Sequence, residues 1–277
     1  MQDFFRAIWV IAYRDLIRFV QERARLISSF AMPLMFLVIF GAGFSQMIGD
    51  LTPGVDFIQF MYPGIIAMTV LMGSLMSGLS VVWDREFGFL KEVLVAPLSR
   101  AGIVLGKTVG TAVISLGQGL IMLVLAPVIG VTVDGMLVLK LIPLLIIVSM
   151  CMSGFGILLA SRMRSMQGFQ LLTQIILMPL VFLSGVFFPV NNVPTWLEVI
   201  SKINPLTYGV DAIRQAFLGA VDMTGIAAAP GLEGMPPPPT GLTVFGHTMT
   251  IFEDAAVVAV LGAVLVAAAV VAFSRRD

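Results

Sequence analysis

Residues 83–100 read WDREFGFLKEVLVAPLSR and separate two long apolar runs, at 57–82 and 101–129. The segment carries six charged residues, whereas each flanking run exceeds the roughly 20 residues that a helix needs to cross a bilayer. Charged side chains are costly inside the hydrocarbon core, so this segment is expected outside it. The stretch therefore predicts two transmembrane helices joined by a charged loop that is available to a partner.

The composition of the whole chain is typical of a membrane protein. Of its 277 residues, 58% are hydrophobic and only 12% are charged, and the mean hydropathy is +1.03. Soluble domains carry about twice that share of charge. Continuous apolar runs predict an all-α polytopic membrane protein with six transmembrane helices. The spans are expected at 26–47, 57–82, 101–129, 136–160, 168–190 and 254–273.

The basic residues predict the orientation of the chain in the membrane. Of the 16 lysines and arginines, 13 fall on one side of the predicted spans, leaving Lys140, Lys202 and Arg214 for the other. By the positive-inside rule both termini are cytoplasmic, which requires an even number of spans. The membrane is expected to be the cytoplasmic membrane of a prokaryotic cell. The basic residues are spread over loops next to the membrane, where anionic lipid is a sufficient partner. No nucleic-acid partner is predicted.

This orientation divides the chain into an interface helix at 1–25 and a six-span domain at 26–277. Within the domain, 83–100 is a cytoplasmic loop and 191–253 is an external segment between spans five and six. The first part of that external segment predicts short re-entrant helices. The second part is rich in glycine and proline and predicts an irregular loop.

The N-terminal segment predicts an amphipathic helix lying in the plane of the membrane surface. Its charged side chains share one face, which Phe4 and Ile11 interrupt. Such a helix either anchors the chain alone or also presents its polar face to a cytoplasmic partner. The apolar face holds Phe5, Ile8, Trp9, Ala12, Leu16, Phe19 and Val20, and the polar face holds Asp3, Arg14, Arg18, Gln21, Glu22 and Arg25.

No catalytic or metal-binding constellation is predicted, so the chain is not expected to be an enzyme or to bind a cofactor. The single histidine, His247, lies in a loop, and the single cysteine, Cys151, lies in an apolar run. Residues 101–108, AGIVLGKT, end like a phosphate-binding loop, but Ala101 stands where that motif has its first glycine. We expect Lys107 to reach the membrane interface and no acidic residue to lie deep in a span. If the chain is a transporter, the energy for transport must come from a source other than ion coupling within the spans.

Neutral polar residues and methionines suggest a substrate path through the spans. Flexible methionines and uncharged amides can accept varied amphipathic ligands. The plain alternative is helix packing through small residues and interhelical hydrogen bonds, which the pattern favours over a path. The candidate path residues are Met68, Met72 and Met76 in span two, and Gln170 and Gln174 in span five.

Three segments resemble the type-2 ABC exporter permeases, especially the branch that includes the daunorubicin-resistance permeases. They are REFGFLKEVLVAPLSR at 85–100, FLSGVFFPVNNVPTWL at 182–197 and INPLTYGVDAIR at 203–214. The third is the most specific, because hydropathy alone does not produce it. Together with the six predicted spans, the resemblance covers nearly the whole chain.

The resemblance implies a permease without an ATPase of its own. It implies pairing with a second permease, identical or homologous, and docking of two copies of a separate ABC ATPase that binds ATP and Mg²⁺. By this resemblance, the ATPase-docking residues are Glu86, Phe87, Leu90, Lys91, Glu92 and Leu94. An external gate is formed by Asn204, Pro205, Tyr208, Asp211 and Arg214.

The sequence thus predicts the permease subunit of an ATP-driven exporter for an amphipathic, lipid-like or drug compound. Export of a lipid-linked polysaccharide or oligosaccharide is the alternative within the family. An ATP-independent secondary carrier or a membrane scaffold is the alternative outside it.

Overall fold

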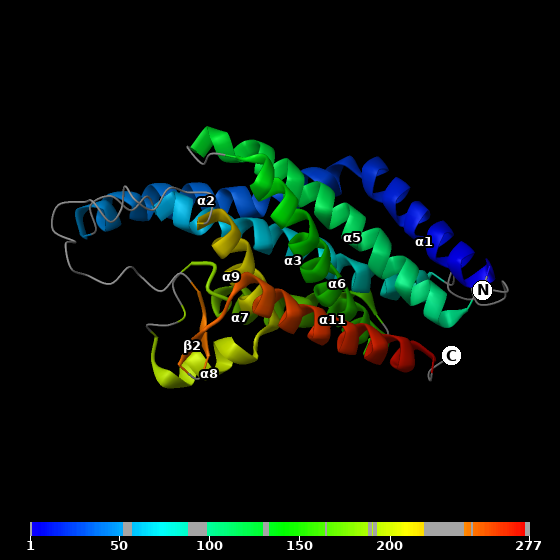
Figure 1. Cartoon of the computed structure of the whole chain (residues 1–277). Helices are drawn as coiled ribbons and strands as arrows, with labels where there is room; N and C mark the ends of the chain where they lie inside the picture. The colour runs from blue at the N-terminus through cyan, green and yellow to red at the C-terminus, as the bar shows by residue number, and fades with distance from the viewer. Residues whose placement is uncertain are drawn as a thin grey trace.

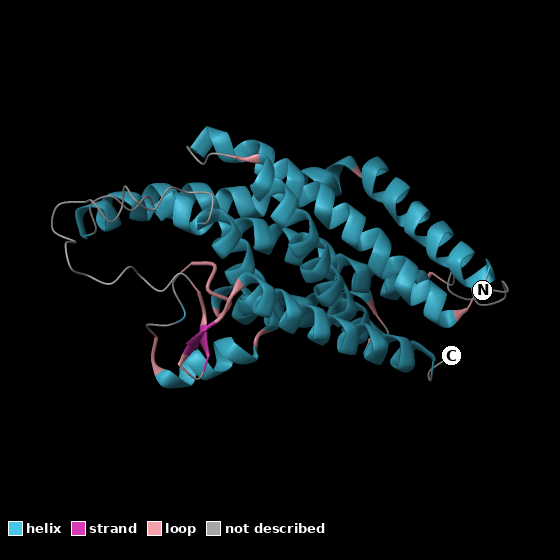
Figure 2. Cartoon of the chain, in the orientation of Figure 1, coloured by secondary structure: helices cyan, strands magenta, loops and turns pink. Residues whose placement is uncertain are grey.

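The computed structural model of this chain is a bundle of long helices with one small β hairpin (Figure 2). The structure describes residues 2–51, 57–87, 99–129, 133–163, 165–187, 190, 193–218, 241–244 and 246–274. The long helices are α2 (Arg23–Leu51), α3 (Phe57–Glu86), α5 (Arg100–Leu125), α6 (Gly135–Arg162) and α11 (Ile251–Ser274).

Four helices are individually long and apolar enough to cross a membrane, within the part of the chain that the structure describes. They are α3, from Met61 onward, together with α5, α6 and α11. A fifth crossing arises if α1 (Gln2–Gln21) and α2 are counted as one span, although the pair bends by 71° at their junction. The helical membrane fold is confirmed, and the six-span count stays a prediction.

The expected fifth span is shorter in the structure than the apolar run at 168–190. Helix α7 (Met166–Phe182) has 17 residues. At a rise of about 1.5 Å per residue, the helix is shorter than the roughly 30 Å thickness of the hydrocarbon core. The chain turns after it, and Gly185 takes a φ of 83°, which only glycine adopts readily. The run carries no charged residue over its whole length, but its helix ends at this turn.

Close backbone contacts hold the centre of the bundle together. Helix α3 is almost fully enclosed, with Met61, Ile65 and Ile66 all buried in the main core. A Cβ on Gly78 would run into the backbone of Gly156 on α6, so these two helices touch at their glycines. Gly154 makes a similar approach to Val266 of α11, where an added Cβ would lie 2.9 Å from a backbone nitrogen. Small residues are what allow transmembrane helices to pack this closely.

The segment after α7 forms a cap at one end of the bundle. It contains α8 (Thr195–Ile203), α9 (Pro205–Leu218), and a hairpin of β1 (Thr243–Val244) and β2 (His247–Thr248). The two helices were predicted, whereas the hairpin was expected to be irregular. The proline run at 236–239 lies outside the described residues. The start of α1 and the end of α11 lie together at the end of the bundle opposite to α8 and the hairpin (Figure 1).

Helix α1 packs along α5 through a ladder of glycines four residues apart. Ala7 approaches Gly102, Ile11 approaches Gly106, and the Ala12 backbone would lie 2.9 Å from a Cβ on Gly110. Ile11, which interrupts the predicted polar face of α1, is 3% exposed and packs against α5. The prediction divided α1 between water and lipid and overlooked a third side that faces protein. The glycines of the phosphate-loop look-alike serve this helix contact.

Candidate functional site

A cluster of four charged side chains lies at the base of the 83–100 loop. This loop-base cluster consists of Arg14 and Asp15 of α1, Asp84 of α3 and Lys107 of α5. Lys107 Nζ lies 2.8 Å from Asp84 and 3.7 Å from Asp15. Arg14 lies 3.0 Å from Asp84 and 2.9 Å from Asp15. Two positive and two negative charges therefore join α1 to the helices that enter and leave the loop.

The position of Lys107 differs from the prediction. Its side chain is 2% exposed and also donates a 2.9 Å hydrogen bond to Ser80, so it does not extend to the membrane surface. Asp84 is likewise buried, with a side chain 6% exposed. A buried ammonium is tolerated only when its donors and its charge are satisfied, and here two carboxylates and a hydroxyl do so. Both side chains are buried by protein, whereas the sequence predicted Asp84 in an exposed loop and Lys107 at the membrane interface.

The last turn of α3 also holds the junction between α6 and α7. Arg85 donates a 3.0 Å hydrogen bond to the carbonyl oxygen of Met163, just after α6 ends. Glu86 accepts a 2.8 Å hydrogen bond from the backbone N–H of Met166, the first residue of α7. A carboxylate at a helix N-terminus satisfies an otherwise unpaired amide and interacts favourably with the helix dipole. One turn of α3 thus contacts four other elements.

Two of the six predicted docking residues are described by the structure. Glu86 is exposed but already engaged at α7, and Phe87 is 65% exposed. The Phe87 ring lies 4.9 Å from the ring of Trp83, which in turn carries Arg18 of α1 at 4.8 Å over its face. Leu90, Lys91, Glu92 and Leu94 lie outside the described residues. Their docking role stays a prediction.

The predicted external gate residues anchor α9 over the end of α7. Asn204 donates to the Leu180 carbonyl at 2.7 Å, and Arg214 donates to the Gly185 carbonyl at 2.5 Å. Asn204 also accepts from the backbone N–H of Leu206, which caps the first turn of α9. Pro205 occupies the first position of that helix, where its missing N–H costs nothing. Asn204 therefore satisfies a carbonyl group in the last turn of α7, and Arg214 satisfies one in the turn that follows α7.

A second polar group fixes α9 to the hairpin and to α11. Gln215 Nε2 lies 2.9 Å from Asp211 and 3.0 Å from Asp254 of α11, while Asp211 accepts at 2.6 Å from the Leu242 N–H. Tyr208 donates to the Lys202 carbonyl at 2.8 Å. Burial lowers the pKa of Arg214 to about 10, an effect that neighbouring Asp211 opposes, so the guanidinium stays charged at neutral pH. Sequence reasoning did not identify Gln215 or Asp254.

The predicted path residues do not converge on one cavity within a single chain. Met68 is 1% exposed and belongs to the main core, and Met72 and Met76 are partly buried. Gln170 and Gln174 instead lie on the exposed face of α7, beside Leu171 and Ile175. Hydrogen bonds between serines link α3 to α5 and to α6, as expected for packing through small polar residues. Ser74 and Ser115 are 3.0 Å apart, and Ser77 and Ser153 are 2.9 Å apart.

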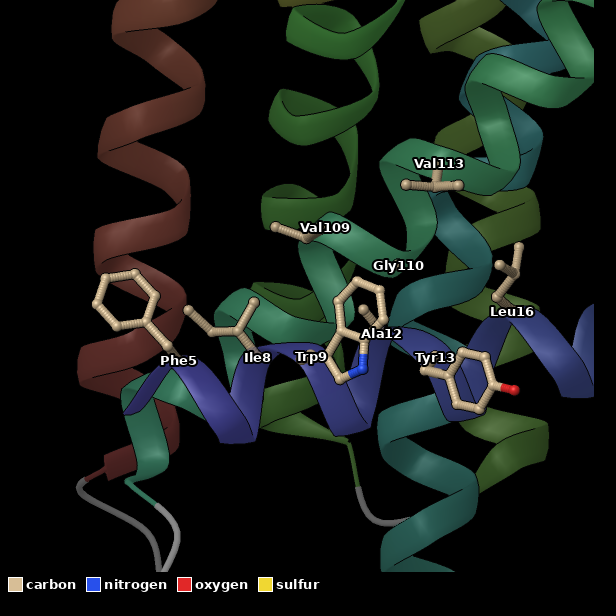
Figure 3. A pocket seen from close by; sticks show the side chains of 9 residues that line it. All are labelled: Phe5, Ile8, Trp9, Ala12, Tyr13, Leu16, Val109, Gly110 and Val113. Atoms are coloured by element: carbon tan, nitrogen blue, oxygen red, sulfur yellow. The ribbon is translucent and has the colours of Figure 1, made fainter. Parts of the chain in front are cut away.

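An apolar groove of about 610 Å³ runs between α1 and α5 and includes none of the predicted path residues. Its α1 wall consists of Phe5, Ile8, Trp9, Ala12, Tyr13 and Leu16, and its α5 wall of Val109, Gly110 and Val113 (Figure 3). Trp9 and Tyr13 stack with their rings nearly parallel, 6.2 Å apart. The groove holds no catalytic group.

Comparison with known families and proteins bears on what these clusters do. A family model described as ABC-2 type transporter matches residues 6–218, from α1 through the end of α9. The match includes the whole loop-base cluster. It also includes the cap helix α9 and excludes α11 with Asp254.

Of three individual relatives of the chain, two are permeases by name. The putative transport permease ycf38 of Cyanophora paradoxa is 33% identical over 218 residues, which is 76% of this chain and 74% of that protein. The probable multidrug ABC transporter permease YbhR of Escherichia coli K12 is 32% identical over 168 residues, 60% of this chain and 45% of YbhR. Nodulation protein J of Rhizobium meliloti is 26% identical over 199 residues, covering 71% of this chain and 75% of that protein.

Proposed function

Because the chain belongs to the ABC-2 type transporter membrane family, we propose that it is the permease subunit of an ATP-driven exporter. It pairs with a second permease, identical or homologous, and two copies of a separate ABC ATPase drive the pair. The ATPase binds ATP and Mg²⁺, and this chain binds neither. The cargo is an amphipathic, lipid-like or drug compound, which is consistent with the name of YbhR. Both termini lie in the cytoplasm of a prokaryotic cell.

The loop-base cluster is the observation that carries this proposal. Residues 83–100 are the segment expected to receive force from an ATPase. Asp84 lies at the start of this segment on α3, and Lys107 lies seven residues beyond its end on α5. Their 2.8 Å ion pair, shared with Arg14 of α1, sits in a buried setting where charges interact strongly. A displacement of the loop is therefore passed to α1, α3 and α5 together. Glu86 extends the same connection to α7.

The cap supports a gating role for α9. Asn204, immediately before α9, binds a carbonyl group of α7. Within α9, Arg214 binds the carbonyl group of Gly185 and Gln215 binds a carboxylate of α11, so movement of α9 is coupled to these elements. The exposed Gln170 and Gln174 on α7 fit a path bounded by two permeases, because neither side chain is enclosed within one chain. Glu86 contacts the N-terminus of α7 and Asn204 contacts its last turn, so movement of α7 would couple the loop to the gate.

The proposal is tested by isolating the chain from its native membrane through an affinity tag. We expect an ABC ATPase to copurify, and we expect Mg-ATP hydrolysis by the complex but not by the chain alone. Reconstituted vesicles should then move an amphipathic dye only when ATP and the ATPase are both present. A catalytically dead ATPase is the matched control.

Two results would overturn the proposal. One is saturable ATP binding by the purified chain without any partner. The other is dye movement driven by a proton or sodium gradient with no ATPase in the membrane. If ATP hydrolysis is retained but responds only to lipid-linked oligosaccharide, the cargo assignment is wrong while the assignment as a permease holds.

A further inference from the structure

The groove between α1 and α5 is formed by tight packing at its floor and wide side chains at its rim. Gly110 lets the Ala12 backbone come close, so the two helices touch there without filling the space above. Trp9, Tyr13 and Val113 stand around this floor (Figure 3). The loop-base cluster and the glycine ladder fix α1 from its other side, so the groove exists without a ligand. Its volume of about 610 Å³ lies within the range of about 300–1,000 Å³ of small-molecule sites.

The walls of the groove are exposed to whatever surrounds the chain. Phe5 is 65% exposed, Trp9 71% and Tyr13 55%. Wide apolar exposure of this kind indicates a surface covered by lipid or by protein. One wall is a candidate membrane span, and the other is an amphipathic helix that bends by 71° away from the next helix. The groove thus lies between a candidate span and the amphipathic helix packed along it, and its rim carries tryptophan and tyrosine, which are enriched at membrane–water interfaces.

A cation lies beside the groove. Arg6 is exposed and precedes Trp9 by three residues, so the two side chains project from the same side of α1. The combination is an apolar groove with a positive charge beside its aromatic rim. That combination complements an acyl chain attached to an anionic phosphate.

We propose that this groove is a binding site for one acyl chain of an anionic phospholipid, whose phosphate is held by Arg6. The lipid comes from the surrounding bilayer, so apolar burial alone gives little preference for the groove over the bilayer. Selectivity comes from the charge of the headgroup. A basic residue near the headgroups gives about fivefold enrichment of an anionic lipid over a zwitterionic one. The bound chain fills the space between α1 and α5 and so supports the angle of the helix that carries Arg14 and Asp15.

Trp9 is a built-in reporter of this site. The chain has three tryptophans, and Trp83→Phe with Trp196→Phe leaves Trp9 alone. This variant is reconstituted in vesicles containing phosphatidylglycerol or phosphatidylcholine with brominated acyl chains, which quench nearby tryptophan fluorescence. We expect brominated phosphatidylglycerol to quench Trp9 at about fivefold lower mole fraction than brominated phosphatidylcholine. A variant that retains only Trp196, exposed on α8, should show no such difference.

Two further variants separate headgroup from groove. Arg6→Gln should remove the preference for phosphatidylglycerol and leave quenching by phosphatidylcholine unchanged. Val113→Phe fills the groove and should weaken quenching of Trp9 by both lipids. Val124→Phe is the matched control, because Val124 is 76% exposed on the same helix but does not line the groove.

The proposal is overturned if Trp9 and Trp196 respond identically to both lipids, since the surface then has no site. It is also overturned if neither lipid quenches Trp9 while Val113→Phe separates associated copies of the chain, because the groove is then a protein interface. None of these measurements needs ATP or transport. Failure here is therefore distinct from failure of the proposed function.

Discussion

Lys107 shows how much a single buried charge depends on its neighbours. Replacing it with methionine leaves Asp84 and Asp15 together with only Arg14 to balance them. Breaking a buried ion pair from one side typically costs about 3–5 kcal/mol. We therefore expect Lys107→Met to lower the melting temperature of the purified protein strongly. The double variant Lys107→Met with Asp84→Leu removes both charges and should recover much of the loss. Asp84→Leu alone completes the cycle, and a double variant destabilised by the sum of the two single effects would mean that the pair contributes no coupling.

Asp254 is a residue at which replacing the carboxyl group by an amide should not harm the fold. Its Oδ1 atom has no hydrogen-bond partner among the described residues, and Gln215 Nε2 has two hydrogens for three nearby acceptors. An asparagine there adds donors beside Asp211. We expect Asp254→Asn to be neutral or to stabilise the protein by about 1 kcal/mol. Asp211→Asn, the matched change, should destabilise it because Arg214 loses its nearby carboxylate. Thermal unfolding of both variants distinguishes these signs, and a large loss for Asp254→Asn contradicts the assignment.

At the scale of elements, the contact between α3 and α6 depends on the absence of a side chain at Gly78. A methyl group there meets the backbone of Gly156, which has no flexible end to move aside. Overpacking of this kind typically costs about 1–3 kcal/mol. We expect Gly78→Ala to reduce the yield of monodisperse protein on size exclusion. Gly117→Ala should be harmless, because nothing lies within 4 Å of the added Cβ. If the two alanine variants behave alike, the close contact is not limiting.

Hydropathy predicted α3, α5, α6 and α11 well, because a helix in lipid must satisfy its own backbone over a fixed length. Hydropathy predicted a span that extends beyond the end of α7, because it depends only on side-chain polarity and does not detect the turn at Gly185. The loop-base cluster could not be predicted as a cluster, since 23 positions separate Asp84 from Lys107 and no periodicity joins them. One usable signal was present: a lysine inside an apolar run requires a partner. The partners themselves come from α1 and α3, which only the fold brings together.

At the scale of the whole molecule, the two glutamates of the loop region should differ. Glu92 was predicted to dock the ATPase, whereas Glu86 also binds the first amide of α7. We expect Glu92→Arg to prevent copurification of the ATPase while leaving the melting temperature unchanged. Glu86→Lys should weaken attachment and also lower the melting temperature, because it places a cation at a helix N-terminus. Unchanged copurification with Glu92→Arg would contradict the docking assignment.

The shared position of the two chain ends has a practical consequence for establishing what the chain pairs with. The start of α1 and the end of α11 lie at one end of the bundle (Figure 1). Two copies can therefore be fused head to tail by a flexible linker that never crosses the membrane. Such a concatemer fixes the stoichiometry at two and allows one half alone to be mutated. A fusion that works as well as separate chains would establish a homodimer genetically.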